Sequence, residues 1–170
     1  MDKTKTAICA GTFDPPTMGH INIIERGLKI FDRLIVAVAT AVSKDPIFEA
    51  AERVEILNEI FKNSDNVVID SFNGLLVEYA RKSGCNTILR GIRNMSDYEY
   101  ESQMALANKT LAPEIETLYM MTEGHYAHLS SSIIKEIIIC GGSTKGMIHP
   151  IVETRLKEKL QSRGKNASCK

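Results

Sequence analysis

The residues best suited to chemistry in this sequence lie in the segment 11–20, which reads GTFDPPTMGH. A threonine hydroxyl and an imidazole can both donate hydrogen bonds to phosphate oxygens, and Thr12 and His20 supply them here. Thr17 is a favourable helix-capping residue, which would place His20 at the third helical position. The free N–H groups and the positive dipole end of a helix start attract phosphate. The segment therefore predicts a nest for a polyphosphate.

A second candidate site is the stretch RGIR, in which Arg90 and Arg93 flank a short apolar pair. A guanidinium group binds phosphate oxygens in a fork geometry that lysine cannot copy. Gly91, between the arginines, would let the backbone approach a ligand closely. The alternative is that both arginines lie on an exposed loop and pair with Asp97 or Glu99. These residues alone leave both interpretations open.

Alternating strands and helices are needed to bring these residues together. Short apolar runs predict strands at 6–10, 34–39, 67–72, 87–90 and 117–121. Helical spacing of apolar residues predicts helices at 21–28, 52–61, 75–83, 98–111, 131–140 and after Pro150. Continuous apolar strands between helices are typical of a parallel sheet covered on both faces. The expected fold is a doubly wound (Rossmann-like) α/β fold with a five-stranded parallel sheet and helices on both faces.

In such a sheet, ligands bind beyond the carboxyl ends of the strands. The chemically suited residues follow the five predicted strands in turn, namely Thr12, Lys44, Leu76, Arg90 and the segment 125–132. A parallel sheet gathers all of these at one edge. We therefore expect a single site assembled from parts that are distant in the sequence.

Charge and hydropathy exclude several classes of protein. The 170 residues carry 21 Lys plus Arg and 21 Asp plus Glu, so the formal net charge is zero. Without an overall basic field, we expect no nucleic-acid partner. The longest apolar run is too short to span a bilayer, so we expect no membrane partner. The length predicts one domain over 1–160, followed by a polar, flexible tail over 161–170.

The four cysteines are Cys9, Cys85, Cys140 and Cys169, and no two of them form a CxxC pair. Their spacing predicts neither a zinc site nor a disulfide framework. No apolar signal-like region follows the first residues. We expect a cytoplasmic protein without a metal site of its own.

The segment 11–20 resembles the T/HxGH signature of the nucleotidylyltransferase superfamily. The stretch RGIR with the following DYEYE, residues 97–101, resembles more specifically the bacterial phosphopantetheine adenylyltransferase family. The segments 43–46 (SKDP) and 129–132 (LSSS) share that resemblance, which extends over nearly the whole chain. It implies transfer of the adenylyl group of ATP to 4′-phosphopantetheine, giving dephospho-CoA and pyrophosphate in coenzyme A biosynthesis.

The chemistry that the resemblance implies is consistent with these residue types. The nucleophile would be a phosphate oxygen, which is already anionic near neutral pH because its second pKa is about 6. No general base is then needed, and catalysis depends on positioning and on charge stabilisation at the α-phosphate. The resemblance also implies Mg²⁺ carried with ATP, and a homohexamer built as a dimer of trimers.

The resemblance assigns a role to individual residues. His20 would stabilise the transition state, Thr12 would contact both substrates, and Arg93 would bind ATP phosphates. The implied catalytic residues are His20, Thr12, Lys44 and Arg93. The implied ATP-binding residues are Thr12, Phe13, His20, Gly91, Ile92, Arg93, Glu101, Tyr126, Ala127, His128, Leu129, Ser130, Ser131 and Ser132. The implied acceptor-binding residues are Thr12, Lys44, Leu76 and Arg90.

Two other functions remain to be weighed. The first is a nucleotidylyltransferase that acts on nicotinate mononucleotide or makes a CDP-alcohol. It is disfavoured by Thr17, where those relatives generally carry histidine, and by LSSS in place of an ISTT- or ISST-like run. The second is a nucleotide-binding regulator without catalysis, which the presence of His20 and Lys44 disfavours. The chain departs from the family pattern at Cys9, Ala10, Tyr126 and His128, none of which removes a predicted phosphate ligand.

Overall fold

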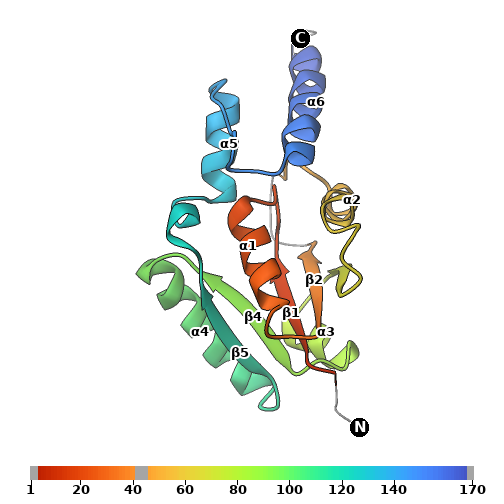
Figure 1. The fold of residues 1–170 in the computed structure, drawn as a ribbon, viewed down its shortest axis with the longest axis vertical. Coiled ribbons are helices and arrows are strands. Elements are labelled where there is room, and N and C mark those ends of the chain that lie inside the picture. Colours follow the sequence, from red (N-terminus) through yellow and green to blue (C-terminus); the bar gives the residue numbers. More distant parts are fainter. Residues whose placement is uncertain (1–3, 41–45, 168–170) are drawn as a thin grey trace.

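Five strands alternate with helices along the chain, of which the computed structural model describes residues 4–40 and 46–167 (Figure 1). The strands are β1 (Thr6–Gly11), β2 (Arg33–Ala39), β3 (Val67–Phe72), β4 (Thr87–Ile92) and β5 (Glu116–Met121). All neighbouring strands pair in parallel, in the order β3-β2-β1-β4-β5. The doubly wound α/β fold predicted from the sequence is confirmed.

The helices connect these strands and extend beyond the sheet. They are α1 (Met18–Gly27), α2 (Ala50–Ile60), α3 (Leu76–Lys82), α4 (Met95–Leu111), α5 (Ser131–Ile139) and α6 (Pro150–Ala167), with a short 3₁₀ turn η1 (Gly124–Tyr126). Helix α6 continues to Ala167 and so enters the segment 161–170, which composition predicted as a flexible tail. Polar residues such as Lys, Gln and Arg are good helix formers, so polarity alone does not end a helix.

Alternating side chains of β1 separate two cores on the two faces of the sheet. Ala7 and Cys9 pack with residues of α1 and α2 on one face. Ile8 and Ala10 pack with residues of α3 on the opposite face. This two-sided burial explains why the strands read as continuous apolar runs.

A third apolar cluster holds α5 and α6 against α2, at one end of the sheet (Figure 1). Ile134 of α5, Val152 and Leu156 of α6, and Ile56 of α2 are its most buried members. The cluster fixes the two C-terminal helices over the edge where the predicted site lies.

Strands β1 and β4 diverge toward their carboxyl ends. They pair only at Ile8 with Ile88 and at Cys9 with Leu89, whereas β1 pairs with β2 up to Gly11. The strand order reverses between β1 and β4, which is the position where ligands bind in open α/β sheets. The divergence therefore opens a crevice at the expected place.

Candidate functional site

A cavity of about 470 Å³ lies at the carboxyl ends of β1 and β4. It brings together most of the residues predicted for the site, although they come from separate parts of the chain. These are Thr12, Phe13, His20, Leu76, Arg90, Gly91, Arg93, Glu101, Leu129, Ser130, Ser131 and Ser132. The structure thus supports the expectation of one composite site at this edge.

Some predicted residues do not line this cavity. Ile92 is buried in the sheet, and the side chain of His128 is exposed. Tyr126 and Ala127 are half-buried in and after the η1 turn. Lys44 lies outside the described residues. The proposed contacts of these residues with ATP or acceptor stay predictions.

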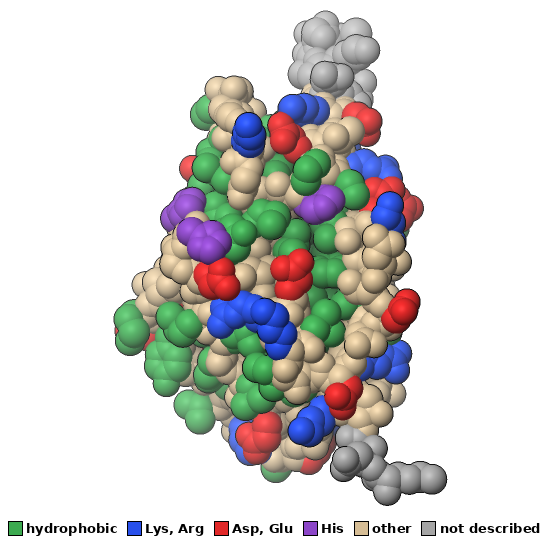
Figure 2. All heavy atoms as spheres, in the orientation of Figure 1, with side chains coloured by type: hydrophobic (Ala, Val, Ile, Leu, Met, Phe, Trp, Pro, Cys, Tyr) green, Lys and Arg blue, Asp and Glu red, His purple; other side chains and the backbone are tan. Residues whose placement is uncertain are grey.

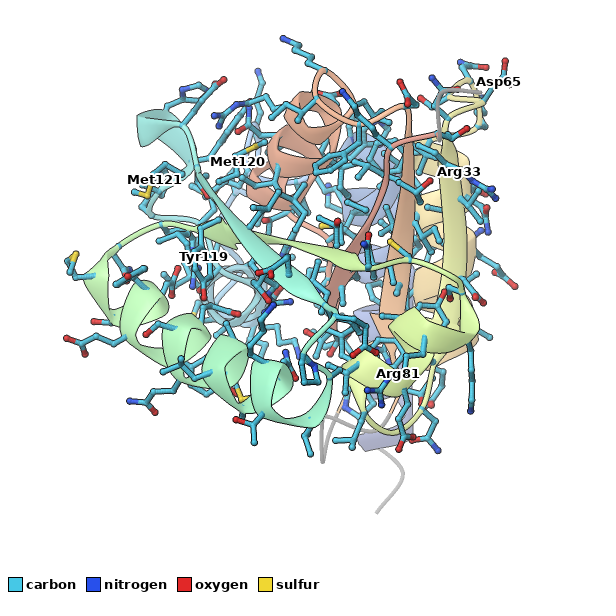
Figure 3. All side chains as sticks on the ribbon, turned by 90° about the horizontal axis from the view of Figure 1, so that it is seen from below. Arg33, Asp65, Arg81, Tyr119, Met120 and Met121 are labelled. Atoms are coloured by element: carbon cyan, nitrogen blue, oxygen red, sulfur yellow. The ribbon has the colours of Figure 1, made fainter. Side chains whose placement is uncertain are left out.

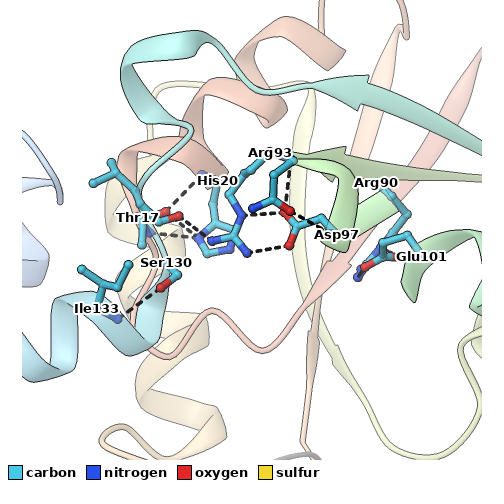
Figure 4. Close-up of polar contacts among 10 residues, drawn as sticks. Thr17, His20, Arg90, Arg93, Asp97, Glu101, Ser130 and Ile133 are labelled. Carbon is cyan, nitrogen blue, oxygen red and sulfur yellow. Dashed lines mark hydrogen bonds and ion pairs between the residues drawn. The ribbon is translucent and has the colours of Figure 1, made fainter. Parts of the chain in front are cut away.

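His20 is held in one orientation by the start of its own helix (Figure 4). The hydroxyl of Thr17 accepts a hydrogen bond from the backbone N–H of His20, as the sequence predicted. In return, the backbone N–H of Thr17 donates to Nδ1 of His20 at 3.0 Å. Nδ1 therefore carries no proton, and a neutral imidazole must carry its proton on Nε2. Nε2 is left as a hydrogen-bond donor.

The surroundings of His20 keep its imidazole neutral. Burial, together with the positive charges of Arg93 and Arg90, lowers the pKa of His20 from 6.5 to about 4. The ring of Phe13 packs edge-on against the imidazole, with 5.2 Å between ring centroids. The site thus offers a fixed, uncharged N–H donor at neutral pH.

The lowered pKa predicts how stability depends on pH. Between about pH 4 and 6.5 the unfolded chain binds a proton at His20 that the folded protein does not bind. The contribution of His20 to the free energy of unfolding is therefore fully present above pH 6.5 and is lost as the pH falls toward 4. Chemical denaturation of wild type and His20→Gln at a series of pH values should show a stability difference that changes over this window, in favour of wild type at higher pH.

An exposed histidine provides the control for this measurement. His128→Gln removes an imidazole from the surface and should keep the wild-type dependence of stability on pH. If His20→Gln followed the wild-type profile throughout, the assignment of a neutral His20 with a lowered pKa would be wrong.

Both arginines of the predicted phosphate site are paired with carboxylates (Figure 4). Arg93 donates from Nε and Nη2 to the two carboxylate oxygens of Asp97, at 2.7 and 2.9 Å, and from Nη1 to the carbonyl of Leu129 at 2.7 Å. Arg90 binds both oxygens of Glu101 and the carbonyl of Ala10. In each arginine, the pair of N–H donors that could bind two phosphate oxygens is already bound to a carboxylate.

The structure shows which carboxylates bind these arginines. Arg93 pairs with Asp97, as the alternative interpretation expected, whereas Arg90 lies on β4 and pairs with Glu101, one turn further along α4. Hydrogen bonds from Arg93 hold the pKa of Asp97 below its usual value, so this carboxylate stays charged. A guanidinium has five N–H donors, and Arg93 uses three of them here. The remaining two donors make no hydrogen bond among the described residues.

The serine segment closes the cavity from the side of α5. Ser130 caps this helix by accepting a hydrogen bond from the backbone N–H of Ile133 at 3.1 Å. The hydroxyl of Ser131 donates to the carbonyl of Pro15 at 2.9 Å and so ties α5 to the segment 11–20. Capping explains why a serine stands at position 130, and Ser130, Ser131 and Ser132 line the cavity at the start of α5.

Comparison with known proteins decides the family. The model of the family described as cytidylyltransferase-like matches residues 8–137. A phosphopantetheine adenylyltransferase of Caldanaerobacter subterraneus subsp. tengcongensis is 50% identical over 157 residues, which cover 92% of this chain and 98% of that protein. The chain belongs to the phosphopantetheine adenylyltransferase family. It is therefore a nucleotidyltransferase, as the motif at 11–20 and the stretch RGIR predicted.

A crystal structure described as a nicotinate-nucleotide adenylyltransferase of Vibrio parahaemolyticus shows the same fold. Its TM-score is 0.63, and the match covers 91% of this chain and 99% of that one. At 17% identity it supports the fold of this phosphopantetheine adenylyltransferase family member and carries no argument about its acceptor.

Packing is tight at two glycines of this family member. A Cβ at Gly91 would lie 2.9 Å from Cγ1 of Ile23, so α1 packs closely against this glycine, which also lines the cavity. A Cβ at Gly11 would lie 3.2 Å from the ring of Phe13, whose backbone takes a φ of 50°. Bulky residues rarely adopt this left-handed conformation, so the turn after β1 is a strained feature of the site.

Sequence reasoning missed the role of Asp14 in this family member. Its carboxylate is 3% exposed and accepts hydrogen bonds from the backbone N–H groups of Ile47 and Phe48, both at 3.0 Å. It also forms an ion pair with Lys135 of α5 at 2.6 Å. Lys135 is 121 residues away, so no local pattern could have indicated this contact.

The rest of the structure adds two findings. No helix in the described part of the chain combines the length and apolar character that crossing a membrane requires. Within residues 4–40 and 46–167, no group of three or more His, Cys, Asp or Glu side chains could hold a metal ion.

Proposed function

We propose that this protein transfers the adenylyl group of ATP to 4′-phosphopantetheine, releasing pyrophosphate and forming dephospho-CoA. The name of the relative from Caldanaerobacter supports these substrates. The observation that carries the proposal is the cavity itself, which joins a fixed imidazole donor and two arginines to a second groove with many apolar side chains.

The second groove suits the pantetheine arm of the acceptor. Its volume is about 230 Å³, and it shares Leu76 and Arg90 with the main cavity. From there it runs between the start of α3 and α4, past Met104 and Asn108. The arm combines apolar parts with amide groups, so an apolar groove with one amide side chain matches its chemistry. Arg90 lies where the phosphate would join the arm, and Lys44 is proposed to bind the same phosphate.

The reaction follows from the positions of the donors. An acceptor phosphate oxygen attacks the α-phosphorus of ATP in line, forming one P–O bond while the bond to pyrophosphate breaks. We propose that Nε2–H of His20 and the hydroxyl of Thr12 stabilise the charge that develops on the α-phosphate oxygens. The remaining donors of Arg93 and the start of α5 would hold the other ATP phosphates. Positioning two anions against each other is the main task.

A pyrophosphate-release assay tests this proposal directly. ATP and CTP are each combined with 4′-phosphopantetheine, nicotinate mononucleotide and an alcohol phosphate. We expect rapid release only from ATP with 4′-phosphopantetheine. Faster release with nicotinate mononucleotide would overturn the proposed acceptor, although the fold and the His20 chemistry would stand.

Leu76 provides a prediction about acceptor choice. All candidate acceptors carry a phosphate, so discrimination must come from the arm, where an apolar contact is worth about 1–3 kcal/mol. Leu76→Asp should raise KM for 4′-phosphopantetheine about tenfold or more, with little change in KM for ATP. Steady-state kinetics with each substrate varied in turn measures both constants.

Ile30→Asp is the matched control for Leu76→Asp. It places the same charge on an exposed apolar residue that lines neither cavity. Both KM values should stay at the wild-type level. If Leu76→Asp left KM for 4′-phosphopantetheine unchanged, the proposal that the pantetheine arm binds in this groove would be wrong.

We propose that Mg²⁺ reaches the site bound to ATP and not in a protein cage. The acidic side chains that line the cavity are Asp97 and Glu101, and both are occupied by arginines. Mg²⁺ keeps several waters and binds phosphate oxygens readily. Turnover should therefore need Mg²⁺ and stop in excess chelator, whereas calorimetry on the nucleotide-free protein should detect no tight Mg²⁺ binding. Tight binding without nucleotide would contradict this proposal.

We propose the homohexamer, a dimer of trimers, as the assembly. The structure contains a surface that fits self-association: apolar side chains gather over α4 and β5 (Figure 2), and Tyr119 and Met121 lie along the outer strand β5 (Figure 3). Strand β5 pairs only with β4 within the described chain, so one edge of the sheet is open. The cytoplasm remains the proposed location, since ATP is the proposed donor and the described cysteines are free thiols.

A further inference from the structure

The side chain of Arg53 in α2 is buried behind the cavity. It is 3% exposed and does not line the cavity itself. Its Nη1 donates one hydrogen bond to the carbonyl of Thr12 at 2.7 Å and another to the carbonyl of Ala39 at 3.0 Å. One amino group thus joins the residues that directly follow β1 and end β2.

These two hydrogen bonds connect β1 and β2 at the position just beyond their last backbone pairing. The ladder between β1 and β2 ends where Gly11 pairs with Val38. Thr12 and Ala39 come next on the two strands and have no such pairing. Arg53 holds their carbonyl groups together at the point where Thr12 enters the cavity.

Stability alone is a poor explanation for a charged residue at this position. Nε of Arg53 is buried without a hydrogen-bond partner among the described residues. Burying a guanidinium with an unsatisfied N–H is costly. A role in orienting the site explains why the arginine is present.

We infer that Arg53 is a positioning residue for adenylyl transfer and acts through Thr12. By fixing the carbonyl of Thr12, it fixes the backbone that directs the Thr12 hydroxyl into the cavity. This inference rests on the proposed role of Thr12 in stabilising the α-phosphate. Arg53 itself contacts no substrate.

The test is a double-mutant cycle of Arg53→Met and Thr12→Val, measured by pyrophosphate release. Misplacing a catalytic group by about 1 Å can cost about 10²-fold in rate. Arg53→Met should lower kcat about 10- to 100-fold with small changes in both KM values. In the Thr12→Val background, the same change should lower kcat less than about threefold, because the group that it positions is gone.

Leu57→Ala is the control for a merely structural effect, since Leu57 is a fully buried residue of the same helix that does not line the cavity. It should lower the melting temperature at least as much as Arg53→Met while keeping kcat near wild type. If Arg53→Met does not fold, Arg53→Lys replaces it in the double-mutant cycle. Lysine keeps a charged donor, so the expected fall in kcat is smaller.

Three results would overturn the inference. One is an additive cycle, which would show that Arg53 does not act through Thr12. Another is a loss of kcat in Leu57→Ala equal to that in Arg53→Met. The third is normal kcat in Thr12→Val, which would also remove the proposed role of Thr12. Wild-type transfer to 4′-phosphopantetheine would leave the proposed function standing in all three cases.

Discussion

Replacing His20 with alanine should lower kcat about 10²–10³-fold, the typical cost of removing one preorganised donor at a developing oxyanion. The imidazole is held by its capping interaction with Thr17 and by the ring of Phe13, so its Nε2–H is in place before substrate binds. It is also neutral, because burial and the two arginines lower its pKa to about 4. Its contribution is therefore directional, through one hydrogen bond, and needs no positive charge.

The variant should remain folded, because His20 lies at the first turn of α1 and not among the fully buried core residues. Single-turnover measurements of pyrophosphate release, with circular dichroism and the melting temperature as controls for folding, separate the two effects. His20→Gln keeps a side-chain N–H of similar reach and should lose less turnover than His20→Ala. A folded His20→Ala variant that turns over within about threefold of wild type would remove His20 from the mechanism, since the expected loss is far larger.

The neutral imidazole also predicts the shape of the pH–rate profile. Since the pKa of His20 is about 4, its titration should cause no change in rate between pH 6 and 8. A fall in rate toward acid should instead begin near the second pKa of the acceptor phosphate, about 6. A mechanism that needed a protonated His20 would show the opposite trend, with rates that fall as the pH rises through that range.

The sequence was sufficient to predict the fold and the edge of the sheet at which the main cavity lies. Apolar periodicity predicted the five strands and placed Thr12, Leu76 and Arg90 at one edge of the sheet, because parallel strands end together. The cap at Thr17 and the position of His20 followed from helix-start rules, and the hydrogen bonds of the capping box confirm them.

The partners of the charged groups could not be predicted in the same way. Which carboxylate binds Arg90 depends on how α4 turns against β4, and this is a matter of packing. Asp14 contacts Lys135 and Arg53 contacts Thr12 across 121 and 41 residues, respectively. Buried polar groups take whichever partner the fold brings close, so such pairs carry no local signal. Gly91 lines the cavity and also makes room for Ile23 of α1, a packing role that the sequence did not indicate.

The second large effect should come from Arg93, and it should depend on Asp97. Arg93→Met removes the donors proposed for the ATP phosphates and leaves the carboxylate of Asp97 without its partner, facing the same cavity. Arg93 and Asp97 are 31% and 22% exposed, so breaking their pair costs less than the about 2–5 kcal/mol of a fully buried charge pair, but it still leaves a charge behind. We expect kcat/KM for ATP to fall about 10²-fold or more, while KM for the acceptor changes little.

The double variant Arg93→Met with Asp97→Asn separates the two causes of this loss. Asparagine keeps the shape of Asp97 and removes its negative charge, so the repulsion of the ATP phosphates disappears while the missing donors stay missing. The double variant should therefore have a kcat/KM for ATP about tenfold higher than that of Arg93→Met, because the repulsion between the carboxylate and the ATP phosphates is gone. Arg81→Met is the matched control. It removes an arginine from an exposed ion pair with Glu114, outside the lining of the cavity, and should leave the kinetics unchanged.

If the double variant were no better than Arg93→Met, Asp97 would serve only to hold Arg93, and its carboxylate would not repel ATP. If Arg93→Met bound and turned over ATP normally, the phosphate site would have to be built from the helix starts alone.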